Sequence, residues 1–189
     1  MKTLNVMADL ETLGVDATSV VLSIALVPFG AGWISTDRFV YRPKVEDQLK
    51  AGATITESTL FWWLTQSNDV RLAEADAVRT DSSIVARQII SDLLFVFEGD
   101  CSVVLWGNGA SFDNVILREF FNRCGILPPW SGRDNLCYRT IKRLYPKLTD
   151  DEVKPCELAH DPYEDAMYQV RYLQALANKH EDLRRLLND

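Results

Sequence analysis

Acidic side chains occupy three places in this chain of 189 residues where the surrounding pattern calls for a hydrophobic one. Asp9 ends an apolar run that begins at Leu4, and Asp113 and Asp165 each stand at the head of the apolar stripe of a predicted helix. A carboxylate at the buried end of an element is costly unless a cation neutralises it. A fold that brings these ends together would form a divalent metal site.

Helical spacing places the two later acids on inward faces. The residues three, four, seven and eleven positions after Asp113 are Ile116, Leu117, Phe120 and Cys124, and those at helical spacing after Asp165 are Tyr168, Tyr172 and Leu176. An acid in a first helical turn can also simply interact with the helix dipole, so this alternative stays open. Asp9 and Glu11 are two residues apart on a predicted strand end, and their side chains should point to the same face.

Alternating and helical patterns divide the chain into strands and helices without repeats or linkers. We predict three strands of an antiparallel meander and one short buried strand, at residues 3–9, 18–29, 32–41 and 103–106. Helices are expected at residues 57–66, 82–98, 111–124, 135–145 and 163–178. The pattern indicates a single α/β domain over residues 1–189, with a mixed sheet covered by helices.

The net charge of −7 argues against nucleic-acid binding through a basic surface. Bound divalent cations would nevertheless make an acidic site locally positive, so a phosphodiester substrate stays open. No apolar run reaches the length of a membrane span, and the N-terminus lacks the apolar segment of a signal peptide. We therefore expect a cytoplasmic location and no membrane association.

His160 precedes Asp165 by five residues, just ahead of a predicted helix whose first turn suits Pro162. A single histidine at such a place is commonly a capping or packing residue. Beside three acids of metal-ligand type it becomes a candidate general base, because an imidazole titrates near neutral pH. The second histidine, His180, lies in a charged stretch and is expected at the surface.

Together these residues resemble the DEDD superfamily of 3′-5′ exonucleases. The matching motifs are Asp9-x-Glu11-Thr12, the pair Phe112-Asp113 opening a helix after a strand, and His160 followed five residues later by Asp165. The third motif is similar to that of the histidine-bearing (DEDDh) branch of the superfamily. The other branch has a tyrosine four residues before the last acid, where this chain has Asp161. A narrower resemblance to stand-alone exonucleases of phages and bacteria is carried by Trp62-Trp63, Trp106-Gly107-Asn108-Gly109-Ala110 and Arg139-Thr140.

The resemblance implies a ribonuclease H-like fold, in which a mixed five-stranded sheet has its first three strands antiparallel and is flanked by α-helices. It also implies hydrolysis of phosphodiesters with two divalent cations, Mg²⁺ or Mn²⁺. The implied metal ligands are Asp9, Glu11, Asp113 and Asp165, with Glu11 also counted as catalytic. His160 would accept a proton from the attacking water, and 5′-mononucleotides would leave from a 3′ end.

Contacts with the terminal nucleotide are also implied by the resemblance. The backbone at Thr12 and the side chains of Glu11 and Leu13 would hold the last sugar and wedge against the last bases. Asn108 is expected to bind substrate, and Phe112 offers a stacking surface, although a core position is equally compatible with its pattern.

The neighbouring Trp62 and Trp63 cannot both face one way on a helix. One is expected in the core and the other, taken as Trp62, at a base or a partner subunit. Arg139 begins a basic stretch that ends at Lys147 and favours either a solvated helix face or contact with the substrate backbone.

We therefore expect a 3′-5′ exonuclease that acts on single-stranded DNA or RNA 3′ ends or on 3′ overhangs, with DNA slightly favoured. An exoribonuclease or oligoribonuclease is the alternative enzyme, and a non-catalytic nucleic-acid-binding relative is the alternative from another class. A homodimer stays open.

Overall fold

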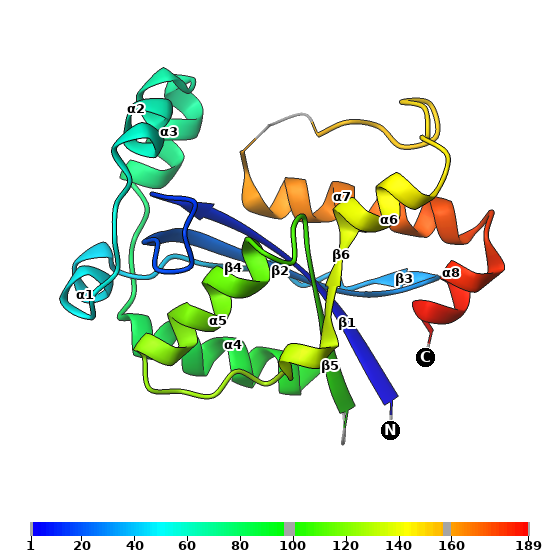
Figure 1. The fold of residues 1–189 in the computed structure, drawn as a ribbon, viewed down its shortest axis with the longest axis horizontal. Helices are drawn as coiled ribbons and strands as arrows, with labels where there is room; N and C mark the ends of the chain where they lie inside the picture. Colours follow the sequence, from blue (N-terminus) through cyan, green and yellow to red (C-terminus); the bar gives the residue numbers. More distant parts are fainter. Residues whose placement is uncertain (1, 97–100, 157–159, 189) are drawn as a thin grey trace.

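A mixed sheet runs through the computed structural model, which describes residues 2–96, 101–156 and 160–188, and helices cover both of its faces (Figure 1). The strands are β1 (Lys2–Thr12), β2 (Val21–Gly30), β3 (Trp33–Ile34), β4 (Phe39–Tyr41), β5 (Cys101–Gly107) and β6 (Asn135–Cys137). The helices are α1 (Val45–Lys50), α2 (Glu57–Thr65), α3 (Asn68–Ala75), α4 (Ser82–Val96), α5 (Asp113–Arg123), α6 (Tyr138–Leu144), α7 (Pro162–Ala177) and α8 (Glu181–Leu186), and a 3₁₀ turn, η1 (Gly132–Asp134), precedes β6.

The sheet has the strand order β3-β2-β1-β5-β6, and β4 also pairs with β2. β1 is antiparallel to β2 and parallel to β5, which is in turn parallel to β6. β3 and β4 are both antiparallel to β2 and lie along its free edge, one after the other. The predicted ribonuclease H-like α/β arrangement, with five strand positions of which the first three are antiparallel, is therefore confirmed.

The single third strand predicted over residues 32–41 is wrong, because the chain leaves the sheet between β3 and β4. The Ser35 hydroxyl accepts a hydrogen bond from the Asp37 backbone N–H at 3.2 Å, forming a local turn that interrupts the pairing. β6 also differs from the prediction, because its three residues fall in the helix predicted from residue 135, whereas α6 begins only at Tyr138.

The remaining helices that the sequence missed are short: α1, α3 and α8 have six to eight residues each. The predicted helices at 57–66, 111–124 and 163–178 match α2, α5 and α7 closely. The predicted stop of the helix at 82–98 falls at Gly99, outside the described residues. No helix in the described ranges is both long and apolar enough to cross a bilayer.

Side chains alternate along β1 and divide the core between the two faces of the sheet. Leu4, Val6, Ala8 and Leu10 pack in a cluster that also contains the buried faces of α4 and α5. Met7 points the other way and packs in a second cluster, with α7 and α8. Asp9 follows the alternation of Met7, which brings it to the α7 side of the sheet.

Candidate active site

A cleft of about 680 Å³ opens where β1 and β5 end and where α5 and α7 begin. The carboxyl ends of parallel strands are the usual place for ligands in open α/β sheets. The four predicted metal ligands and the predicted base all line this cleft: Asp9, Glu11, Asp113, His160 and Asp165. The structure thus brings together side chains that are up to 156 residues apart in the sequence.

Helix α2 is fastened to the end of β1 and forms one side of the cleft. The indole N–H of Trp63 donates to the Thr12 carbonyl at 2.8 Å, and the Thr56 N–H donates to the Leu13 carbonyl at 2.8 Å. Trp63 is buried and Trp62 is 40% exposed, which confirms that one tryptophan lies in the core. Trp62 instead lines the cleft.

Asp113 enters the cleft because α5 starts close against the end of β5. A Cβ added at Gly107 would lie 2.4 Å from Asn114 Oδ1 and 2.8 Å from the Asp113 Cβ, so this approach requires glycine. Asp113 itself is only 3% exposed. The predicted inward stripe is confirmed by the burial of Ile116, Leu117 and Phe120. Gly107 was recognised within the Trp106–Ala110 motif without being given a structural role, although a glycine at a strand end was a signal for one.

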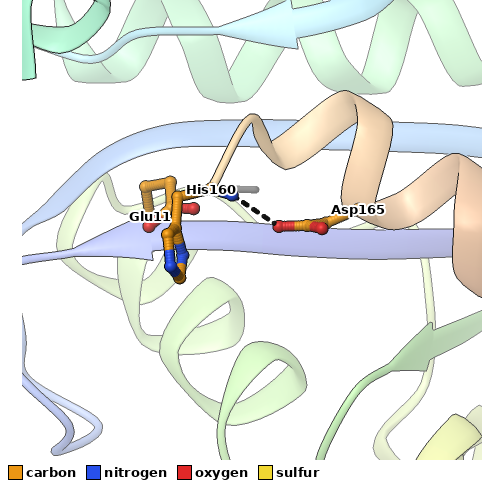
Figure 2. Close-up of side chains that lie close together, drawn as sticks. All are labelled: Glu11, His160 and Asp165. Atoms are coloured by element: carbon orange, nitrogen blue, oxygen red, sulfur yellow. Dashed lines mark hydrogen bonds between the residues drawn. The ribbon is translucent and has the colours of Figure 1, made fainter. Parts of the chain in front are cut away.

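His160 has an unusual backbone at the start of α7. Its φ of +64° makes it the one residue other than glycine with a positive φ among the described residues. Its backbone N–H donates to Asp165 Oδ2 at 3.1 Å (Figure 2). Asp161 caps the helix by accepting from the N–H groups of Tyr163 and Glu164, both at 3.0 Å, and Pro162 occupies the first turn as predicted. A left-handed backbone costs about 1–2 kcal/mol, so these contacts hold His160 in a strained conformation.

Glu11, His160 and Asp165 converge from β1 and from the start of α7 (Figure 2). Each offers a donor atom, and these atoms lie within 4.8 Å of one another, which is close enough to share a metal ion. The ring of Trp62 meets the His160 ring nearly at a right angle, with centroids 5.0 Å apart. The His160 side chain is therefore oriented by two contacts, the backbone hydrogen bond to Asp165 and the ring contact with Trp62.

The carboxylates in the cleft disfavour one another's charge. Burial raises the pKa of Asp9 well above its ordinary value, and the charges of Asp113, Glu11 and Asp165 raise it further. Burial, followed by the charge of Asp165, raises the pKa of Glu11 to about 8. Burial raises the pKa of Asp113 to about 7, although nearby backbone N–H groups and the charge of Arg139 lower it. Arg139 offsets only part of this repulsion, and a divalent cation would supply further positive charge.

Helix α6 brings basic side chains to the opposite side of the cleft. Arg139 and Lys142 both line it, together with Tyr138 and Tyr168. The Lys142 ammonium lies 5.2 Å from the centroid of the Tyr172 ring and 5.7 Å from that of Tyr138. Arg139 and Lys142 therefore face the cleft, which agrees with contact to the substrate backbone rather than with a wholly solvated helix face.

Five of the predicted substrate-binding residues line the cleft: Thr12, Trp62, Asn108, Phe112 and Arg139. Leu13 does not, and its expected place at the cleft needs correction. After an irregularity in β1 between Glu11 and Thr12, the Leu13 side chain packs against the apolar cluster of Leu22, Trp63 and Val70. Val15, which is 65% exposed, lines the cleft instead.

Gln169 is a residue of the cleft that sequence reasoning missed. It lies one helical turn after Asp165 on α7, and its amide Nε2 donates to Asp9 Oδ1 at 2.7 Å. The helical spacing of four from Asp165 was the available signal, since it places both side chains on one face.

Comparison with known families gives one match over most of the chain. The model described as "3'-5' exoribonuclease Rv2179c-like domain" matches residues 4–177. A comparison with curated protein sequences gave no significant match.

Solved structures with the same fold are nucleases of low sequence identity. Cell-death related nuclease 4 (CRN-4) is 16% identical with a TM-score of 0.61, and the match covers 93% of this chain and 64% of CRN-4. This chain therefore spans less than two thirds of the length of CRN-4. The nuclease domain of 3′hExo, a DEDDh family member bound to rAMP, is 11% identical with a TM-score of 0.58, covering 93% and 92%. Exonuclease X in complex with 5′ overhanging duplex DNA is 17% identical with a TM-score of 0.51, covering 98% of both chains.

These likenesses agree with the ribonuclease H-like sheet, and none of them supports the narrower phage resemblance or a homodimer. The family implies divalent metal ions, and the structure brings acidic side chains together in one cleft. The chain belongs to the 3′-5′ exoribonuclease Rv2179c-like domain family.

Proposed function

We propose that Asp9, Glu11, Asp113 and Asp165 hold two divalent cations, and that the cleft uses them to remove 5′-mononucleotides from single-stranded 3′ ends. The convergence of these carboxylates on one cleft carries the proposal, because their charges raise one another's pKa values and call for a cation. The oxygen-only set of carboxylates suits Mg²⁺, and Mn²⁺ accepts the same ligands.

When bound, such cations stabilise the charge that develops on the attacking and leaving oxygens and make a bound water more acidic. The protein's own part is to place the reacting groups. Glu11 and Asp165 come from different elements and are set by the strand end and by the first turn of α7. The two acids therefore reach the cleft from two different elements.

His160 is proposed as the general base that accepts the proton of the attacking water. Its imidazole lies beside Glu11 and Asp165 in the cleft, and the Trp62 ring limits its rotation. Asp165 also helps to orient His160. Its Oδ2 accepts the backbone N–H of His160, which is in the left-handed conformation. A histidine held in one orientation loses little entropy when it accepts the proton.

The substrate strand is proposed to enter between α2 and α6. Thr12, Asn108 and Phe112 would contact the terminal nucleotide, and the aromatic face of Trp62 would contact a base. Arg139 would contact a backbone phosphate, because it is a cation in an acidic cleft.

We propose RNA as the preferred substrate, supported by the description of the matching family model as an exoribonuclease domain. The sequence by itself slightly favours DNA, and that prediction stays as the other outcome of the test. The discrimination would depend on contacts to the 2′-hydroxyl. One exonuclease domain over residues 1–189 would carry the whole activity.

A test compares RNA and DNA oligonucleotides of one sequence, each with a 5′ label, in Mg²⁺, in Mn²⁺ and in EDTA. Single strands, 3′ overhangs and blunt duplexes are run together, because paired ends must fray before they enter the cleft. We expect ladders that shorten from the 3′ side, faster on RNA, and no products in EDTA. Mid-strand products from a strand with a blocked 3′ end would contradict the proposal, and a tenfold preference for DNA would reverse only the choice of sugar.

A further inference from the structure

The side-chain amide of Gln169 makes one hydrogen bond in the cleft through its nitrogen, while its carbonyl oxygen makes none to the described residues. Its Nε2 donates to Asp9 Oδ1 at 2.7 Å, and the side chain is only 3% exposed. Its Oε1 is buried and has no hydrogen-bond partner among the described residues. A buried polar atom without a partner destabilises the fold, so such atoms in a native protein call for an explanation.

Packing does not explain a glutamine at this position of α7. The neighbouring inward positions are occupied by Ala166, Val170 and Leu173, all fully buried in the apolar cluster that covers this face of the sheet. An unbranched apolar residue would fill the same space without an unpaired amide. A position where stability favours an apolar residue and the chain carries a polar one is typical of a functional site.

We propose that Gln169 is a positioning residue that fixes the Asp9 carboxylate for cation binding. This inference rests on the proposed role of Asp9 as a metal ligand. Asp9 stands near the end of β1, and the bond to Gln169 ties one of its two oxygens to a helix packed against the sheet. The carboxylate then keeps one orientation without a cation, which lowers the entropy lost when the cation binds.

The orientation of the Gln169 amide follows from its partner. In the ionised form that binds a cation, Asp9 Oδ1 is an acceptor, so Nε2 faces it, because the reversed amide would set two oxygens against each other. Oε1 is thereby the acceptor that remains in a residue lining the cleft. It is available to a water molecule of the hydrated cation.

The test uses two variants of the intact chain, Gln169→Met and Gln169→Asn. Methionine keeps the length of the side chain without its amide, and asparagine keeps the amide but is one methylene too short to reach Asp9. Gln174→Met is the matched control, since Gln174 is also on α7 and donates instead to the Gly30 and Trp33 carbonyls at 2.7 and 2.9 Å. Two Gln169 variants keep the test decisive if one of them fails to fold.

The main readout is the affinity for Mn²⁺ alone, measured by titration without substrate. We expect both Gln169 variants to bind Mn²⁺ about 10–100-fold more weakly, as is usual when a group supporting a metal ligand is removed. The Mn²⁺ concentration for half-maximal hydrolysis should rise by a similar factor, while KM for the oligonucleotide at saturating Mn²⁺ changes by less than about twofold. The control should bind Mn²⁺ like the wild type.

Wild-type Mn²⁺ affinity in the Gln169 variants, or equal weakening in the Gln174 control, would overturn the inference. Asp9→Asn is measured in parallel to separate it from the proposed function. If Asp9→Asn also binds Mn²⁺ normally, the proposed ligand set itself fails. If Asp9→Asn alone loses binding, Asp9 keeps its role and only the role of Gln169 is refuted.

Discussion

Replacing Asp113 by asparagine should stabilise the metal-free protein at pH 8 while abolishing hydrolysis. The carboxylate is almost completely buried, and its pKa is raised from 3.8 to about 7, mainly by that burial. Above both pKa values the folded protein therefore carries a charge that it disfavours, and asparagine removes this charge with little change of shape. The loss of activity follows from the proposed role of Asp113 as a metal ligand.

The size of the effect follows from the two pKa values. At about 1.36 kcal/mol for each pH unit, the rise corresponds to about 4 kcal/mol of lost stability at pH 8. Asparagine gives up part of the interaction with the backbone N–H groups of Asp113, Leu10 and Asn108, at a cost of about 1–2 kcal/mol. The net gain of about 2–3 kcal/mol should raise Tm by about 4–12 °C in a chain of this size.

The gain should disappear in acid, because wild-type Asp113 takes up a proton as the pH falls through its folded pKa. At pH 5 most of the penalty is gone and the two proteins should melt within a few degrees of each other. The assay is thermal unfolding in EDTA at pH 5 and pH 8, with the exposed Asp150→Asn as control. A gain of equal size at both pH values, or a lower Tm of Asp113→Asn at pH 8, would refute the electrostatic reasoning.

Three further outcomes are expected. The metal-free wild type should lose stability as the pH rises from about 4.5 to about 8, because burial raises the pKa of Glu11 from 4.5 to about 8. Added Mg²⁺ should restore most of the lost stability at pH 8, and unfolding in EDTA that does not vary with pH would contradict this reasoning. His160→Ala should lower kcat by roughly 10²–10⁴, and an unchanged kcat would exclude it as the base. Gly107→Ala should cost about 1–3 kcal/mol in urea unfolding and lower kcat, because its Cβ would lie 2.4 Å from Asn114 Oδ1, whereas Gly109→Ala, with its nearest contact at 3.6 Å, is the control that should leave stability nearly unchanged.

Periodicity was enough to predict the site's acids and the elements that carry them. The inward stripes that begin at Asp113 and Asp165 are properties of consecutive residues, so they are visible before any tertiary contact is known. Asp9 and Glu11 fall on one side of β1 for the same reason, as their contacts with α7 residues show. The approach of these elements to one point also followed, because isolated buried carboxylates would be too costly.

Short elements escaped prediction because their stability comes from distant partners. β6 has three residues and exists through parallel pairing with β5. β3 and β4 are separate because a local turn interrupts pairing with one neighbouring strand, β2. The first residues of the predicted helix at 135–145 pair as a strand instead, so tertiary pairing overrode local propensity there.

The geometry around the acids was decided by the tertiary structure. The left-handed backbone of His160 is stable only because Asp165, and the Trp62 ring from another helix, hold the residue in place. Leu13 turns away from the cleft because an apolar cluster under α2 and α3 accepts it. Gln169 reaches Asp9 across 160 positions of sequence. The sequence by itself determined which acidic side chains face inward, because periodicity is a local property of consecutive residues. The orientation of each side chain depends instead on contacts between distant segments.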